Sequence, residues 1–465
     1  MKIYNTLTQQ VEELKPLEEK KIKMYVCGIT PYDEVHLGHG RCYVIFDLLR
    51  RYLRYKGYSV KYVQNFTDID DKIIKASKDS GLSTAELTSK YIKAYFEVEK
   101  QLNITPADVY PKVTEHIEDI ILSIEKLVQK DYAYITQTGV YFDIRKFSSY
   151  GKLSKRKIEE LIAGARIEPD ETKRYPLDFA LWKFTKSSEE QIFRGWESPW
   201  GRGRPGWHIE CSVMSMKYLG ETLDIHGGGE DLIFPHHENE IAQSEALTDK
   251  EFVRYWVHNG FVTINKQKMS KSLKNIFALK DLFALYNPMV IRLFLLSQHY
   301  QNPLDFSIEN IKQFEAVYQK FENLVEEVNF RMKNLHNSYD ISLKIKNEVE
   351  QIVKDFEDAL DNNLNTSEAL SVVNKMYSFI FNLQTENKNE LMFVYEKFLT
   401  MLDVLGIRVS VNEEIPQEIL LLVDEREIAR KNKDYAKADI IRKEIFQKGY
   451  IIEDTKLGPK IKKRY

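Results

Sequence analysis

The stretch KMYVCGITPYDEVHLGHGR (Lys23–Arg41) joins an apolar run to a turn rich in glycine and histidine, and an amphipathic segment follows it. Residues 22–27 predict a short buried strand, and residues 41–56 predict a helix that ends before a glycine. A second strand is expected at residues 59–66. Two strands separated by a helix indicate a right-handed βαβ unit, so this stretch predicts a parallel, doubly wound sheet of the Rossmann-like type.

The next part of the chain continues this pattern and then interrupts it. Helices are expected from Asp68 and from Ser83, and the second is opened by a capping box formed by Ser83 and Glu86. A hairpin is expected at Tyr134–Ile144, and the polar sequence after it is typical of an insertion. We therefore expect one α/β domain that is divided by an inserted segment.

After the insertion the alternation of strands and helices resumes, and one expected helix covers Phe234–Leu247. From about Phe306 the chain predicts an α-helical bundle, and a small α+β domain with a short strand at Tyr450–Glu453 follows. The expected parts are the two halves of a Rossmann-like domain (1–131 and 205–258), the inserted connective segment (132–204), a loop and stem-contact region (259–305), the helical bundle (306–406) and the C-terminal domain (407–465).

The composition is that of an ordinary globular protein, with 465 residues of which 29% are charged and 43% are hydrophobic. The sequence has no apolar run long enough to span a bilayer and no signal or transit segment at its start, so we expect a cytoplasmic protein with no membrane partner. Cys27, Cys42 and Cys211 are odd in number and scattered, which favours free or metal-bound thiols over disulfides. Nothing in the sequence points to a dimer interface, and a monomer is expected.

Positive charge is concentrated near the C-terminus, although the whole chain carries a net charge of only −3. Residues 430–465 contain twelve Lys or Arg and five Asp or Glu. Such a segment is either a solvated tail or a phosphate-binding surface, and composition alone leaves both alternatives open.

The tetrad HLGH (His36–His39) lies in the first strand-to-helix crossing and allows several interpretations. Because Cys27 lies nine residues before it, the two histidines could belong to one zinc site with that cysteine. Alternatively, Gly38 admits a ligand to the backbone, and two imidazoles on one side of the first helical turn favour a phosphate. An ordinary helix start is the third possibility, so the tetrad alone is a weak signal.

The pentapeptide KMSKS (Lys268–Ser272) follows a strand-like run at residues 260–264 and places Lys268 and Lys271 on a loop. Two lysines there could hold a triphosphate, or they could simply be solvated. HLGH and KMSKS are about 230 residues apart, each at an edge of the expected sheet. In this order and spacing the two motifs resemble the HIGH and KMSKS signatures of the class I aminoacyl-tRNA synthetases.

A second cysteine and a histidine-rich helix supply further residues of metal-ligating types. His236 and Glu240 are four residues apart and share one helix face. With Cys27 at the carboxyl edge of the first strand and Cys211 near a helix start, they form a plausible zinc set. His237 is an equally available imidazole that should point roughly 100° away from His236, so only one of the two is expected to face Glu240. The cysteines could also be ordinary core residues.

Five motifs together resemble the cysteinyl-tRNA synthetases: CGIT (27–30), NFTDIDDKI (65–73), GRPGWHIECS (203–212), HGGGEDLIFPHHENE (226–240) and KMSKS. The similarity runs through essentially the whole chain. It implies an ATP-dependent ligase that activates L-cysteine as cysteinyl-adenylate and transfers it to the 3′ end of tRNA(Cys). It also implies Mg²⁺ with the ATP and one Zn²⁺ per chain, which would recognise the substrate thiolate.

The resemblance assigns a role to particular positions, although Trp207 and His226 could equally be core residues, and Arg430 and Asp454 could be solvated. The implied roles are zinc binding for Cys27, Cys211, His236 and Glu240; catalysis and ATP binding for His36, His39, Lys268 and Lys271; amino-acid binding for Gly28, Thr67, Trp207 and His226; and anticodon recognition by the C-terminal domain for Arg430 and Asp454.

Two other functions are compatible with parts of the sequence. A ligase that transfers activated cysteine to a small amine would share the first half of the chain but lack the C-terminal tRNA-binding region. A non-catalytic RNA-binding paralogue should have lost parts of HLGH or KMSKS, and both motifs are intact here.

Overall fold

The computed structural model forms two compact units, described one at a time below. The first unit comprises Met1–Glu315, Lys354–Val373 and Met401–Arg408, and the second comprises Ala316–Val353, Asn374–Thr400 and Val409–Tyr465. The residues described are 1–155, 172–186, 192–264, 266–268, 277–337, 340–409, 415–455 and 458–463.

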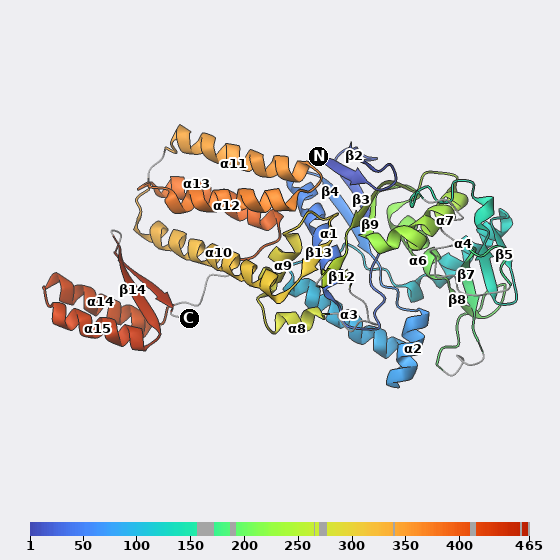
Figure 1. The fold of residues 1–465 in the computed structure, drawn as a ribbon, viewed down its shortest axis with the longest axis horizontal. Coiled ribbons are helices and arrows are strands. Elements are labelled where there is room, and N and C mark those ends of the chain that lie inside the picture. The colour runs from blue at the N-terminus through green and yellow to red at the C-terminus, as the bar shows by residue number, and fades with distance from the viewer. Residues whose placement is uncertain are drawn as a thin grey trace. The chain divides into compact units, whose positions relative to one another are not determined.

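A parallel sheet of four strands is the centre of the first unit: β10 (Val253–Asn259), β9 (Leu223–Gly229), β3 (Lys21–Val26) and β4 (Ser59–Gln64), in that order. β3 and β4 pair in register from Lys21 with Ser59 to Val26 with Gln64. Helix α1 (Leu37–Tyr55) connects these two strands (Figure 1). The predicted parallel α/β sheet is therefore confirmed, and α1 begins four residues earlier than predicted. The other helices of this region are α2 (Asp71–Ser80), α3 (Thr84–Gln101), α4 (Ile117–Gln129), α6 (Trp207–Leu219) and α7 (Glu238–Thr248).

The insertion is a second, antiparallel sheet with the order β5-β6-β7-β8, whose strands are β5 (Ala133–Ile135), β6 (Gly139–Phe142), β7 (Phe179–Phe184) and β8 (Gly203–Pro205). The sequence predicted its first hairpin but not β7 and β8, because β8 is only three residues long and ends in a proline. Buried aromatic side chains such as Phe142, Phe179 and Trp182 share one core with Ile124 of α4 and Met214 of α6. This core attaches the insertion to the parallel sheet's helices (Figure 1).

Short elements complete the first unit. A hairpin opens the chain, with β1 (Lys2–Asn5) antiparallel to β2 (Gln10–Glu13). A small sheet has the order β12 (Gln267–Lys268), β11 (Val262–Ile264), β13 (Leu304–Phe306). The helices α8 (Leu279–Phe283) and α9 (Pro288–Leu296) lie between β12 and β13 in the chain, and 3₁₀ turns occur at Val113–Glu115, Ile144–Lys146 and Glu230–Leu232.

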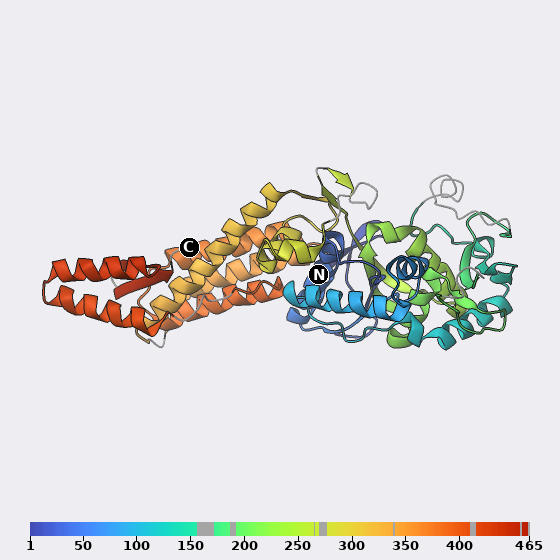
Figure 2. The same ribbon diagram turned by 90° about the horizontal axis from the view of Figure 1, so that it is seen from below.

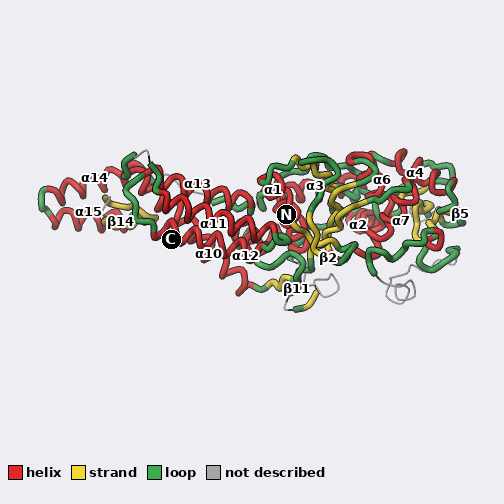
Figure 3. The backbone as a smooth tube through the Cα atoms, turned by 90° about the horizontal axis from the view of Figure 1, so that it is seen from above, coloured by secondary structure: helices red, strands yellow, loops and turns green. Residues whose placement is uncertain are grey.

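Four long helices follow β13: α10 (Ile308–Asn334), α11 (Leu343–Asp361), α12 (Thr366–Asn382) and α13 (Lys388–Val404). They form the predicted helical region, which is almost entirely red in the tube view (Figure 3). Within the second unit, the ring of Phe321 on α10 packs edge-on against Phe398 on α13, with centroids 5.6 Å apart.

The C-terminal α+β segment has two helices, α14 (Gln417–Lys431) and α15 (Tyr435–Gln447), which lie side by side (Figure 2). A hairpin of β14 (Tyr450–Thr455) and β15 (Gly458–Lys463) covers them, although only its first strand was predicted. Its core consists of Ile419, Val423, Ile441, Ile445 and Ile452. Across the residues that the structure describes, no helix is both long and apolar enough to cross a membrane.

Candidate functional site

A cluster of metal-ligating side chains lies at the carboxyl edge of the parallel sheet, where such sheets bind their ligands. All are buried. Cys27 Sγ, at the end of β3, lies 3.7 Å from Cys211 Sγ and 3.6 Å from Glu240 Oε1. His236 Nε2 lies 3.0 Å from the same carboxylate oxygen. The members of the cluster are Cys27, Cys211, His226, His236, His237 and Glu240.

Two of the separations among these donors match those around one tetrahedral zinc ion. Zinc–sulfur bonds of about 2.3 Å and zinc–oxygen bonds of about 2.1 Å imply S···S and S···O separations of about 3.8 and about 3.6 Å. The separations in the cluster are 3.7 and 3.6 Å. Among the described residues, His236 Nε2 and Glu240 Oε2 are buried without a hydrogen-bond partner, which a bound cation would remedy. The donor set therefore fits zinc.

Burial controls the protonation of the cluster. It raises the pKa of the Cys27 thiol and of the Glu240 carboxyl group well above their usual ranges. Burial acts in the same direction on Cys211, but the hydrogen bond from the Cys27 thiol and the nearby His236 imidazole outweigh it and lower the pKa of Cys211 to about 7. Burial and the neighbouring imidazoles lower the pKa of His237, so its ring is neutral. Thiolate and neutral imidazole are the forms that bind metals.

The two adjacent histidines both face Glu240, so the expectation that only one could do so is wrong. His236 Nε2 and His237 Nε2 lie 3.0 and 3.9 Å from Glu240 Oε1. Residues three and four positions before a helical residue flank it on either side, about 60° and 40° away. The predicted single helix over Phe234–Leu247 is also wrong: α7 begins at Glu238, and the backbone of Phe234 is extended (φ −138°, ψ 133°), because a residue that precedes a proline is disfavoured in the helical conformation.

A surrounding layer of side chains orients the imidazoles. His236 Nδ1 lies 2.9 Å from a ring nitrogen of His208, and the His236 ring stacks on Trp207 with centroids 4.1 Å apart. Trp207 is 37% exposed and is therefore not a core residue. His226, by contrast, is fully buried and stacks on Trp256. Its Nε2 atom lies 3.5 Å from Cys27 Sγ, so it belongs to the cluster itself.

Gly28 and Thr67 lie at the ends of neighbouring strands. Gly28 N donates to Asn65 Oδ1 at 2.8 Å, and a Cβ atom on Gly28 would lie only 1.5 Å from the Asn65 carbonyl oxygen. Only glycine allows this approach. Thr67 Oγ1 donates to Glu210 Oε2 at 3.2 Å, and burial raises the pKa of Glu210 well above its usual range.

The histidines of HLGH form a reciprocal cap at the start of α1. His39 N donates to His36 Nδ1 and His36 N donates to His39 Nδ1, both at 3.3 Å, and the rings stack with centroids 3.6 Å apart. An Nδ1 atom that accepts a hydrogen bond carries no proton, so a neutral ring must carry its proton on Nε2. The cap thus sets both rings in the tautomer that donates through Nε2, and neither histidine belongs to the Cys27 cluster.

The backbone on either side of the KMSKS segment forms hydrogen bonds with neighbouring elements of the first unit. Lys268 lies in β12, paired with β11, and Lys271 lies outside the described residues. After that gap, Leu37 N donates to Phe277 O at 3.1 Å and Leu279 N donates to Val35 O at 2.9 Å. A backbone ladder therefore ties the residues that follow the undescribed segment to the start of HLGH.

The comparisons with known proteins agree with this geometry. A family model described as "tRNA synthetases class I (C) catalytic domain" matches residues 13–316. A protein of Caldicellulosiruptor saccharolyticus called "Cysteine--tRNA ligase" is 49% identical over 467 residues and covers all of both chains. A protein of Clostridioides difficile with the same description is 47% identical over 469 residues, again across both full lengths. The chain belongs to the cysteinyl-tRNA synthetase family.

Solved structures of other synthetases share the fold of this family member. A methionyl-tRNA synthetase of Mycobacterium tuberculosis in complex with methionyl-adenylate has a TM-score of 0.60 at 16% identity and covers 83% of this chain and 89% of its own. A leucyl-tRNA synthetase of Agrobacterium radiobacter in a ternary complex with tRNA has a TM-score of 0.61 at 10% identity and covers 85% of each chain. At such identities the likeness concerns the fold alone.

In the synthetase's C-terminal segment, Arg430 and Asp454 lie together. Arg430 Nη1 donates to Asp454 Oδ1 at 2.5 Å. Arg426, which is nearly fully buried, binds both oxygens of the same carboxylate at 2.9 and 2.8 Å. Asp454 therefore has a structural partner besides any role in recognition.

Sequence reasoning missed several residues of this synthetase's site. Asn65 and Glu210 lie in motifs that carried the family resemblance, but only the fold reveals their hydrogen bonds to Gly28 and Thr67. Arg41, two residues after HLGH, is fully buried and donates to backbone carbonyl groups before β11 and before β13. A polar side chain inside a motif was the only available signal.

Proposed function

We propose that this enzyme activates L-cysteine with ATP and transfers the cysteinyl group to the 3′ end of tRNA(Cys), with a zinc ion held by Cys27, Cys211, His236 and Glu240. The observation that carries the proposal is the buried set of two thiols, an imidazole and a carboxylate with zinc-like spacing at the carboxyl edge of β3. Full-length relatives described as cysteine–tRNA ligases support the same reaction.

Selection of cysteine over serine is the chemical problem that this cluster addresses. A pocket built on shape separates close analogues by only about 10²-fold. A zinc ion in the cluster would supply a Lewis acid that prefers a thiolate to a hydroxyl group. His237 and His226 are additional buried imidazoles within 3.5 Å of Cys27 Sγ, able to hydrogen-bond a bound thiolate. Gly28, Thr67 and Trp207 would border the rest of the amino acid.

Adenylate formation requires donors for the phosphates of ATP. The cysteine carboxylate would attack the α-phosphate in line and release pyrophosphate, with positioning and charge stabilisation as the enzyme's main contribution. His36 and His39 would donate through Nε2–H to the α-phosphate, an assignment supported by the cap that occupies both Nδ1 atoms. Lys268 and Lys271, with Mg²⁺, would neutralise the leaving phosphates, and the ladder between Leu37 and Phe277 would keep them near His36.

The second step is attack of the terminal ribose hydroxyl of tRNA on the adenylate carbonyl carbon. The C-terminal segment would recognise the anticodon through Arg430 and Asp454, whose side chains can reach base edges of an unstacked loop. Arg430 is partly exposed, at 38% of its side chain, as such contact requires. We propose a cytoplasmic monomer, divided into the six parts expected from the sequence.

Cysteine-dependent ATP–pyrophosphate exchange, measured with and without tRNA, tests the proposal most directly. We expect exchange without tRNA and charging of tRNA(Cys) when it is added. Absence of exchange would refute the proposed cysteine activation, and exchange without charging of tRNA would favour a ligase that acts on a small amine.

Substitution of the cluster cysteines tests the zinc assignment. Cys211→Ser should reduce zinc, measured by elemental analysis, from about one per chain to a small fraction and should abolish activation. Cys42→Ser is the matched control, because Cys42 is a free cysteine on α1 outside the cluster, and it should keep its zinc. His39→Ala should slow exchange while zinc stays bound. Full zinc content in Cys211→Ser would contradict the ligand set.

A further inference from the structure

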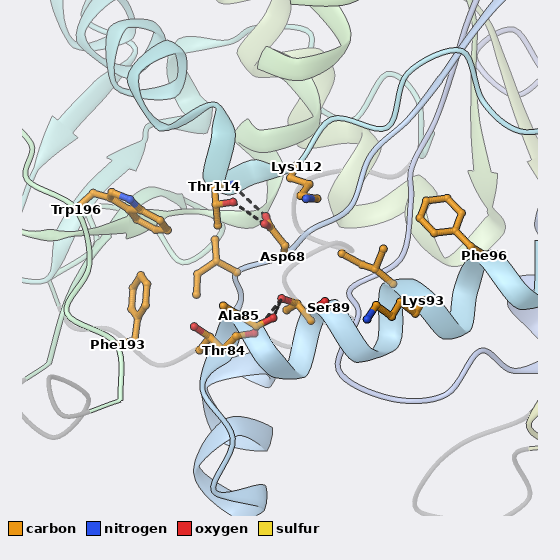
Figure 4. Close-up of a pocket in the computed structure, with 13 residues that line it drawn as sticks. Asp68, Thr84, Ala85, Ser89, Lys93, Phe96, Lys112, Thr114, Phe193 and Trp196 are labelled. Atoms are coloured by element: carbon orange, nitrogen blue, oxygen red, sulfur yellow. Dashed lines mark hydrogen bonds between the residues drawn. The ribbon is translucent and has the colours of Figure 1, made fainter.

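The insertion meets the rest of the first unit in two different ways. Near Phe193 and Trp196 it borders a cavity of about 540 Å³, one side of which is formed by α3 (Figure 4). Residues 147–155 instead bind directly to α7, the helix that carries the predicted zinc ligand Glu240. This second contact is packed without a cavity of that kind, and it lies against the metal cluster.

Residues 147–155 form a series of tight turns, which we call the strap. Tyr150 N donates to Phe147 O at 3.0 Å. Further along, Lys155 N donates to Gly151 O at 3.0 Å. Gly151 has a φ of 95°, in the region of backbone conformation that favours glycine. In turns of this kind several backbone N–H groups can point to one side, where they form a site for an anion.

The anion in this site is the carboxylate of Glu238, the first residue of α7. Its Oε1 atom accepts from Gly151 N at 2.9 Å, and its Oε2 atom accepts from Leu153 N at 3.1 Å and from Ser154 N at 2.8 Å. Glu238 is fully buried, and no Lys, Arg or His side chain among the described residues forms an ion pair with it. Because a buried carboxylate is costly without hydrogen bonds, the strap and Glu238 stabilise each other.

Two further contacts join the strap to the same helix. Tyr150 Oη donates to Asn239 Oδ1 at 2.5 Å. Lys152 Nζ pairs with Glu245 Oε2 at 2.6 Å, and these two side chains keep 28% and 15% of their surface exposed. An ion pair that is partly exposed contributes less than a buried charge with several hydrogen bonds. Glu238 is therefore the main attachment of the strap.

The strap and the metal cluster share one buried core. Leu153 of the strap is 1% exposed and belongs to the same core as Cys27 and Cys211, with Phe147 packed against it. Protein interiors are close-packed, so the two thiols cannot move apart into the space that Leu153 occupies. The strap therefore opposes any opening of the cluster.

Glu238 also fixes the backbone from which two predicted ligands project. It lies two residues after His236 and two residues before Glu240, at the start of α7. His236 Nε2 and Glu240 Oε1 are 3.0 Å apart in the cluster, whereas the Glu238 carboxylate faces the strap. Side chains that orient metal ligands without touching the metal change its affinity by about 10- to 100-fold when they are lost.

We infer that Glu238 is a positioning residue that fastens the strap over the predicted zinc cluster and thereby slows release of the zinc, an inference that rests on the proposed function. Glu238 acts through its neighbours His236 and Glu240, whose backbone it holds, and through Leu153, which the strap keeps in the core. The insertion thus helps to retain the metal on which recognition of cysteine depends.

Release of zinc from the full-length, zinc-loaded enzyme into an excess of the chromogenic chelator pyridylazoresorcinol measures the effect. Glu238→Gln keeps the shape of the side chain but loses one acceptor oxygen, and it should release zinc about tenfold faster than the wild type. Glu245→Gln is the matched control, because it removes the ion pair with the same strap and keeps an oxygen for Phe252 N. Its release rate should stay within about twofold of the wild type.

Hydrogen exchange and unfolding rates show whether the strap causes the faster release. Exchange of residues 150–154, followed by mass spectrometry, should accelerate in Glu238→Gln and not in Glu245→Gln. Release of zinc from Glu238→Gln should also be faster than its global unfolding, followed by tryptophan fluorescence under the same conditions. Equal rates of release and unfolding would mean general destabilisation and would overturn the inference.

The absorption bands of cobalt(II) bound in place of zinc separate positioning from ligation. These bands depend on the atoms that bind the metal, so they should be the same in Glu238→Gln as in the wild type and should change in Cys211→Ser. Altered bands in Glu238→Gln would make Glu238 a ligand and the inference wrong.

The outcomes separate this inference from the proposed function. A wild-type enzyme that holds no zinc, or that lacks cysteine-dependent exchange, would remove the proposed function itself. Full zinc in the wild type with equal release rates in Glu238→Gln would overturn only the inference, as would faster release without faster hydrogen exchange in the strap. If Glu238→Gln does not fold, Tyr150→Phe removes only the hydroxyl group that binds Asn239 and should release zinc about threefold faster; an unchanged rate would count against the strap.

Discussion

Replacement of Arg41 by methionine should loosen the chain segments that carry the KMSKS loop. Arg41 lies in the first turns of α1 and is fully buried, and no carboxylate among the described residues forms an ion pair with it. Instead its guanidinium group donates to backbone carbonyl groups before β11 and before β13. The acceptors are the carbonyl oxygens of Gly260, Phe261, His299, Tyr300 and Asn302.

The magnitude follows from which of these oxygens keep another donor. The bonds to Gly260, His299 and Tyr300 are long, at 3.2–3.3 Å, and those carbonyls accept from other groups as well. The short bonds go to Phe261 and Asn302, at 2.7 and 2.5 Å. Each hydrogen bond from a charged group contributes about 1.5–3 kcal/mol. Both oxygens are partly satisfied without Arg41, because Phe261 O also accepts from Leu304 N at 2.9 Å and water can reach the exposed residue Asn302. The local loss is therefore about 3 kcal/mol, a factor of about 150 in an equilibrium constant.

Hydrogen exchange followed by mass spectrometry measures this loss. In Arg41→Met, peptides covering residues 260–264 and 299–304 should exchange about 150-fold faster, while zinc content stays at the wild-type level. Cysteine-dependent ATP–pyrophosphate exchange should fall, because the support of the KMSKS loop is loosened.

Arg50→Met is the matched control, since Arg50 is also a buried arginine of α1. It donates to the carbonyl oxygens of Thr105 and Pro106 and pairs with Asp108. Its loss should loosen residues 105–108 and leave 260–264 protected. Unchanged exchange at 260–264 in Arg41→Met, or the same pattern in both variants, would refute the reasoning.

Three further changes have outcomes fixed by single contacts. Gly28→Ala should lower cysteine activation at least 100-fold in the pyrophosphate-exchange assay, because its Cβ atom would lie 1.5 Å from the Asn65 carbonyl oxygen; near-normal activity would show that the strand end can shift. Burial tends to raise the pKa of Asp71, but Arg204 and a neighbouring lysine outweigh it and lower this pKa from its usual 3.8 to about 2. The ionised carboxylate therefore stabilises the fold above about pH 4, and this contribution is lost as the pH falls toward 2. With 45% of that side chain exposed, Asp71→Asn should cost about 1 kcal/mol in urea unfolding at pH 7 and clearly less at pH 3; a difference that grows on acidification would contradict the sign. Arg426→Met should destabilise the C-terminal segment by about 3 kcal/mol, measured by limited proteolysis, and should weaken tRNA binding. Cysteine activation, measured by pyrophosphate exchange, should stay unchanged, and reduced activation would contradict this prediction.

The local elements could be predicted because their causes are local. The capping box of Ser83 and Glu86 is present as predicted, with Glu86 N donating to Ser83 Oγ at 3.2 Å. The strand β4 begins at Ser59, as expected from its apolar pattern. The break before α7 was missed, because a proline inside an apolar pattern interrupts the helix at the preceding residue, Phe234, without changing the pattern.

By itself, the sequence determined the parallel α/β sheet, the helical region after it and the family, because periodicity, caps and spaced motifs are properties of neighbouring residues. Only the tertiary structure decided which side chains meet. Cys27 and Cys211 are 184 residues apart in the chain, and they lie 3.7 Å apart because β9 pairs with β3 and α6 packs beside them. His237 joins their cluster, whereas the nearer His36 and His39 cap α1 instead. Contacts of this kind depend on strand order and packing between distant segments, which no local pattern encodes.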